Sequence, residues 1–169
     1  MAFVFLNFNL EIGGLTIGLL PNFLGYLLIL KGLSELSGLS ARFYKMTPAV
    51  LFVGTYSALA YFLETFGALG GGTAVYVFAL ISINLSLFVS YNIIMGIQDI
   101  EIHRGQDMNF AQLFLAWKIL AVFSFLPFAA QLTPIPLVLA IVIYFVVAFY
   151  FLIILNKTRT LLYLHNPTE

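Results

Sequence analysis

Five polar residues, each near the middle of a separate apolar stretch, are the residues of this chain best placed to do chemistry. They are Asn22, Ser57, Asn84, Lys118 and Tyr144. At 1.5 Å per helical residue, each lies roughly 12–16 Å from one end of its stretch, close to the midplane of a ~30 Å hydrocarbon core. A polar layer at that depth predicts a small transporter or channel-like permease for an ion or a small solute. The alternative is a non-transporting membrane scaffold or accessory subunit, in which the same groups only hold helices together.

Lys118 is the one basic residue in this midplane layer, and two interpretations of it are open. A lysine inside a membrane span is unfavourable unless it has a partner, and by default it marks a functional site. Alternatively, its aliphatic stem lies over Phe114 and its ammonium group reaches the cytoplasmic headgroups. The first interpretation makes Lys118 part of a transport site, and the second makes it an interfacial anchor.

Two carboxylates, Glu11 and Glu64, are expected nearer the outer surface of the membrane. Glu11 stands at the outer end of the first apolar stretch, and Glu64 lies about one turn below the outer end of the second. They could form an outward-facing cation entry, or Glu64 could form an ion pair with Lys118 if the helices tilt. The simpler interpretation is that both are interfacial residues in contact with water.

The composition places the chain among integral membrane proteins. Of its 169 residues, 62% are hydrophobic and only 8% are charged, whereas roughly a quarter of residues in soluble proteins are charged. The net charge is zero and basic residues are scattered, so nucleic acid is not a predicted partner. The chain has no cysteine, which excludes disulfides and thiolate chemistry.

The order of apolar and polar stretches predicts an all-α fold, a single transmembrane domain over residues 1–169 with five membrane-spanning helices. The predicted spans are residues 11–32, 48–66, 74–96, 110–131 and 137–156. Thr47 as N-cap and Pro48 at the first helical position give the second span a favourable start.

Basic residues predict the orientation of the bundle. Six of the seven follow spans one, three and five: Lys31, Arg42, Lys45, Arg104, Lys157 and Arg159. Because positive residues gather on the cytoplasmic side, the N-terminus is predicted outside and the C-terminus inside.

The first span carries small residues on one helical face, at Gly14, Gly18, Gly25 and Gly32. Small residues let a second helix approach closely in lipid, so this face is expected to be buried in the bundle. Pro21 lies mid-span and removes a backbone donor, which predicts a kink there. A helix broken in this way can line a binding site, although proline and glycine are also simply frequent in membrane helices.

Motifs for enzymatic chemistry are missing. The sequence has no HExxH, no glycine-rich phosphate loop followed by lysine and no nucleophile elbow. We therefore expect no enzyme, no cofactor and no metal site. The predicted partners are the lipid bilayer and either a second copy of the chain or another membrane protein.

The run LLPNFLGYLLILKGLSEL, residues 19–36, resembles the opening signature of a family of small, uncharacterised bacterial integral membrane proteins. The resemblance is carried by Leu19, Leu20, Pro21, Asn22, Phe23, Leu24, Gly25, Tyr26 and Gly32. Members often have acidic residues around the proline, where this chain has Thr16 and Asn22. The resemblance implies a multi-pass protein of the bacterial cytoplasmic membrane, and it implies no activity.

Overall fold

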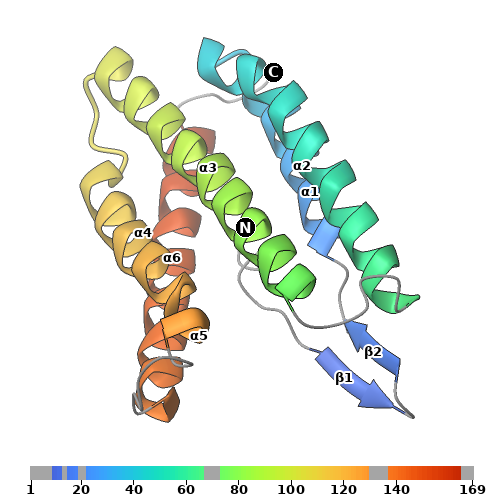
Figure 1. Cartoon of the computed structure of the whole chain (residues 1–169). Helices are drawn as coiled ribbons and strands as arrows, with labels where there is room; N and C mark the ends of the chain where they lie inside the picture. Colours follow the sequence, from blue (N-terminus) through green and yellow to red (C-terminus); the bar gives the residue numbers. More distant parts are fainter. Residues whose placement is uncertain (1–8, 13–14, 19–21, 67–72, 130–136, 165–169) are drawn as a thin grey trace. The chain divides into compact units, whose positions relative to one another are not determined.

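The computed structural model describes residues 9–12, 15–18, 22–66, 73–129 and 137–164. Its elements are β1 (Asn9–Ile12), β2 (Leu15–Gly18), α1 (Asn22–Leu36), α2 (Ala41–Thr65), α3 (Thr73–Arg104), α4 (Phe110–Ser124), α5 (Leu126–Ala129) and α6 (Leu137–Leu164) (Figure 1). Contacts divide the chain into two compact units, residues 1–93 and 94–169, and α3 contributes to both. The single transmembrane domain expected from the sequence stays a prediction.

Among the residues that the structure describes, three helices are long and apolar enough to cross a membrane. The stretches that meet this criterion are Ala41–Leu63 in α2, Thr73–Arg104 in α3 and Val142–Leu162 in α6. Their length and composition agree with the predicted class of helical membrane protein. Helices α1 and α4 have 15 residues each, fewer than the ~20 that one crossing usually needs.

The first span predicted over 11–32 is wrong as a continuous helix. Strands β1 and β2 pair antiparallel, with Ile12 opposite Leu15, and α1 begins only at Asn22. Gly13–Gly14, a dipeptide that favours two-residue hairpin loops, stands between the strands in the sequence. The predicted kink at Pro21 lies outside the described residues.

The glycine face predicted for the first span is therefore not one helical face. Gly18 belongs to β2, whereas Gly25 and Gly32 belong to α1; Gly14 lies outside the described residues. At Gly32 an added Cβ would meet no heavy atom within 4 Å. Close helix approach occurs instead at Gly54 of α2, where an added Cβ would lie 3.2 Å from the Cβ of Tyr26 on α1.

Helix α2 begins earlier than predicted, at Ala41 rather than at Pro48. The Ser40 hydroxyl accepts a hydrogen bond from the Arg42 amide at 3.2 Å, which supplies the N-cap that we had assigned to Thr47. Pro48 consequently lies inside the helix. The predicted fourth span also differs, because α4 ends at Ser124 and α5 follows it.

In the unit formed by residues 1–93, α1 packs beside α2. Tyr26 and Leu33 of α1 and Phe43 and Val50 of α2 are buried, and Tyr26 lies against Gly54 of α2. Phe23 is in the first turn of α1 and Tyr61 is near the end of α2, and the centres of their rings lie 5.9 Å apart. The two helices are therefore antiparallel neighbours along most of the length of α1.

In the unit formed by residues 94–169, α4 packs against α6. Among the described residues of this unit, the buried side chains are apolar apart from one hydroxyl: Ile94, Ile97, Ile100, Met108, Leu113, Ala116, Leu120, Phe151, Ile154 and Thr158. Ile97 and Ile100 come from the end of α3, so this core includes the last turns of that helix. The same turns lead into the loop that connects α3 to α4.

Candidate functional site

The five-residue loop between α3 and α4 has two residues in the left-handed region. Gly105 follows the last residue of α3 with φ 62°, and Asn109 precedes α4 with φ 60°. Glycine after a helix is the usual left-handed terminator, and asparagine tolerates this region better than most residues. The Asp107 carboxylate accepts the Asn109 amide at 2.7 Å, which shapes the turn. The two helices are thereby joined by a short, defined bend.

Glu101, near the end of α3, caps the start of α4. Its Oε2 atom accepts hydrogen bonds from the Met108 amide at 2.8 Å and the Phe110 amide at 3.2 Å. The first amides of a helix have no partner inside the helix, and a negative charge there is favourable. The Asn109 side chain makes no cap hydrogen bond, so the acceptor at the start of α4 is supplied by a residue of the preceding helix.

Thr158 fastens the same loop to α6. Its hydroxyl donates a 2.8 Å hydrogen bond to the Met108 carbonyl, and both residues are only 1% exposed. A buried carbonyl needs a partner, and here the partner comes from 50 residues further along the chain. The loop therefore has one anchor on α3 and another on α6.

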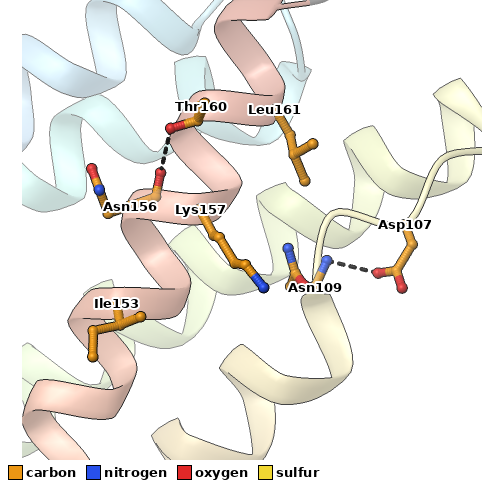
Figure 2. Close-up of a pocket in the computed structure, with 7 residues that line it drawn as sticks. All are labelled: Asp107, Asn109, Ile153, Asn156, Lys157, Thr160 and Leu161. Carbon is orange, nitrogen blue, oxygen red and sulfur yellow. Dashed lines mark hydrogen bonds between the residues drawn. The ribbon is translucent and has the colours of Figure 1, made fainter.

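A hollow of about 530 Å³ lies beside this anchored loop (Figure 2). Asp107 and Asn109 line it from the loop, and Ile153, Asn156, Lys157, Thr160 and Leu161 line it from α6. Figure 2 shows the Lys157 side chain reaching from α6 toward Asn109. The Thr160 hydroxyl donates to the Asn156 carbonyl of its own helix at 3.1 Å. The lining thus combines one cation, one carboxylate and amides with apolar side chains.

Two residues of the predicted midplane layer, Ser57 and Asn84, belong to the unit of residues 1–93. Ser57 is half-buried on α2, and Asn84 is exposed on α3. The Asn84 amide donates to the Leu80 carbonyl at 2.8 Å. Ser82 makes the same bond to Phe78 at 2.9 Å. Asn84 and Ser82 are therefore hydrogen-bonded to their own helix one turn earlier.

Lys118 and Tyr144 belong to the unit of residues 94–169. Lys118 is exposed, and its Nζ atom lies 4.3 Å from the centre of the Phe114 ring. The Phe114 ring stacks in turn against Trp117, with centres 6.0 Å apart. Tyr144 is half-buried and contacts Phe145 edge to face. The ammonium group of Lys118, rather than its aliphatic stem, lies over the Phe114 ring, and both interpretations of this lysine stay predictions.

The remaining predicted site residues fall where only the backbone is described. Glu11 lies in β1 opposite Thr16 of β2, so it is not at the end of a helix. Asn22 is the first residue of α1 and Glu64 the penultimate residue of α2. The alternatives for Glu11 and Glu64, a cation entry, an ion pair of Glu64 with Lys118 or two interfacial residues, stay predictions.

The anchored loop was missed at the sequence level. Glu101, Asp107 and Thr158, which hold this loop, are not among the site residues predicted from the sequence. A usable signal was present: Gly105 and Asn109 bracket a five-residue connection between two helices, and such short connections need a defined bend. Which side chains hold the bend depends on contacts far apart in sequence.

No protein-family model, no curated protein and no solved structure matches this chain.

Proposed function

We propose that this protein is a non-transporting membrane scaffold or accessory subunit, which acts through contacts of its helices within the bilayer. The observation that carries the proposal is the bonding of polar side chains along α3. Ser82, Asn84 and Ser90 each bond to a carbonyl four residues earlier. Side chains engaged in this way have less capacity left for a passing ion or solute, and they leave the helix surface suited to packing.

The apolar faces of the helices support the same proposal. Leu51 on α2, Phe88 on α3 and Phe149 on α6 are each more than half exposed. The hydrocarbon core of a bilayer holds no water, so such faces meet either lipid or another helix there. An accessory subunit uses this kind of surface to hold a membrane protein partner or a second copy of itself.

The alternative is the small transporter or channel-like permease predicted from the midplane layer. It requires Ser57, Asn84, Lys118 and Tyr144 to face one water-filled path. The exposed position of Lys118 over Phe114 favours the anchor instead. Measured flux separates the two functions.

The flux experiment uses purified protein reconstituted into liposomes, with proton, potassium and small-solute leak recorded against protein-free liposomes. We expect no leak above the empty vesicles. A leak that falls when Asn84 is replaced by leucine, but not when the exposed Leu51 is replaced by alanine, would establish transport and overturn the scaffold proposal.

A second measurement tests the scaffold directly. A photo-crosslinking amino acid is placed at exposed Phe88, and at fully buried Val50 as the matched control. We expect a discrete protein–protein product in intact cells from position 88 and none from position 50. Lipid adducts alone at position 88 would contradict a scaffold.

We further propose five membrane crossings, with the N-terminus outside and the C-terminus in the cytoplasm. Phe23 lies beside Tyr61 at the far end of α2, which supports α1 running across the membrane with α2. The hairpin would then lie at the outer surface, and α5 would extend α4 across the outer part of the bilayer. The basic residues Arg42, Arg104 and Lys157 would all lie on the cytoplasmic side.

Single cysteines test this arrangement, because the chain has none of its own. A membrane-impermeant maleimide should label Asn9→Cys and Thr73→Cys in intact cells, and Gln106→Cys only after permeabilisation. The reverse pattern would overturn the orientation. Labelling of Asn9→Cys only after permeabilisation, with Thr73→Cys still accessible, would show that α1 does not cross. This protein is proposed to act in the bacterial cytoplasmic membrane, as the resemblance of residues 19–36 implies.

A further inference from the structure

The hollow between the α3–α4 loop and α6 holds two opposite charges that do not pair with each other. Asp107 and Lys157 both line it, and in the part of the chain that the structure describes no ion pair joins them. In Figure 2 the Lys157 ammonium points toward Asn109, and Asp107 lies on the far side of Asn109. The lining is therefore neutral overall, with its positive and negative groups set apart.

Lys157 stands where α6 changes from apolar to polar. The helix runs from Val142 to Leu155 without a charged residue, and Asn156 and Lys157 follow. Ile153 is one turn earlier on the same helical face and is 64% exposed. A lysine at the end of a membrane-crossing stretch places its ammonium at the level of the lipid headgroups. Ile153 then lies on the hydrocarbon side of the hollow and Asp107 on the water side.

We propose that this hollow binds the headgroup of a phospholipid that carries a primary ammonium, that is, phosphoethanolamine. The phosphate would contact Lys157, the ammonium would contact Asp107, and the start of an acyl chain would lie along Ile153. The volume of the hollow, about 530 Å³, is within the roughly 300–1,000 Å³ of ordinary small-molecule sites. The inference requires α6 to cross a bilayer and does not rest on the proposed function.

The charges around the hollow argue against a purely anionic headgroup. Besides Lys157, the hollow is lined by the carboxylate of Asp107. An anion bound to Lys157 would share the hollow with that carboxylate. A zwitterion places its positive end against Asp107, so both of its charges meet an opposite charge. A quaternary ammonium, as in phosphocholine, has no N–H to donate to the carboxylate.

Native mass spectrometry of the detergent-solubilised full chain tests the proposal, with dioleoyl phosphatidylethanolamine, phosphatidylglycerol and phosphatidylcholine added in equal amounts. We expect the ethanolamine lipid to be retained most. Lys157→Gln should lower retention of the ethanolamine and glycerol lipids about fivefold, the effect of one basic residue at a membrane surface. Asp107→Asn should lower the retention of the ethanolamine lipid by a similar factor and leave the retention of the other two lipids unchanged. Lys157→Arg keeps the positive charge and should retain the ethanolamine lipid as the wild type does.

Matched controls remove the same charges elsewhere: Lys45→Gln on α2 and Glu35→Gln on α1, both exposed, should leave retention unchanged. Equal retention of the three lipids by the wild type, or the same retention in Asp107→Asn as in Glu35→Gln, would overturn the proposal. Soluble phosphoethanolamine and inorganic phosphate at millimolar concentration should not displace the lipid. Complete displacement by either would show that the hollow takes a free solute and not a lipid.

Discussion

The Thr158 hydroxyl donates a 2.8 Å hydrogen bond to the Met108 carbonyl, and both residues are almost fully buried. This bond joins the end of α6 to the loop before α4. With the two amides held by Glu101, it fixes the loop from two directions. Asp107 and Asn109 of that loop line the hollow beside Lys157, so variants that loosen the loop also change the hollow.

Replacing Thr158 by valine removes the hydroxyl at nearly constant volume and leaves the buried Met108 carbonyl without a partner. We expect the free energy of unfolding to fall by about 1–3 kcal/mol. Denaturant or thermal unfolding in detergent micelles measures the change. The control is Thr160→Val, because that hydroxyl is exposed and bonds within its own helix; its effect should stay within about 0.5 kcal/mol. Equal effects of the two variants would refute the role of Thr158.

Glu101→Ala removes the cap of α4 and should destabilise the protein by about 0.5–2 kcal/mol, the range measured for lost N-caps. Glu101→Gln keeps a carbonyl oxygen that can accept the two amides, so its cost should be smaller. Hydrogen exchange of the Met108 and Phe110 amides should accelerate in the alanine variant. Glu35→Ala, on the exposed face of α1, is the control. Unchanged exchange at both amides would show that the cap is unimportant in solution.

Leucine at Gly54 should destabilise the protein by about 1–3 kcal/mol, because the new side chain would collide with Tyr26. Leucine at Gly32 meets open space, and it is a better helix former than glycine by roughly 0.8 kcal/mol. That variant should be neutral or more stable. Comparison of the two melting curves decides where α1 and α2 approach closely. A larger loss at Gly32 than at Gly54 would restore the glycine face predicted from the sequence.

Lys118→Met should lower stability by no more than about 0.5–1 kcal/mol, the value of a cation–π contact at an exposed site. A double-mutant cycle with Phe114→Leu should return a coupling energy of the same size. Neither variant should alter the leak of reconstituted liposomes. If Lys118→Met abolished a measurable flux, the lysine would belong to a transport site after all.

Local sequence determined the class of protein and the starts of three helices. Helices α4 and α6 begin at the predicted residues Phe110 and Leu137, and α3 begins one residue before the predicted start. Each follows a polar, glycine-rich or proline-containing segment and continues as a long apolar run, and these are properties of neighbouring residues. Apolar length alone also predicts that such helices enter a membrane.

Short elements inside the same apolar composition were not recognised. The hairpin of β1 and β2 stands where the sequence predicts a helix, because alternation over four residues is weak evidence inside a 22-residue apolar stretch. The start of α2 was assigned to Thr47 and Pro48 because both are good helix starters, yet Ser40 offers an equally good cap seven residues earlier. Both sites carry a helix-start signal. Beginning at Ala41 gives the helix more backbone hydrogen bonds and includes Phe43 and Met46, which are buried.

The contacts that build the candidate site were decided only by tertiary structure. Nothing near Thr158 in the sequence marks Met108 as its partner, and nothing near Gly54 marks Tyr26. In a chain that is 62% hydrophobic, lipid-facing and buried positions have the same composition, so burial cannot be read from residue type. Which face of a helix packs, and which polar group meets a buried carbonyl, depends on how helices distant in sequence are placed in space.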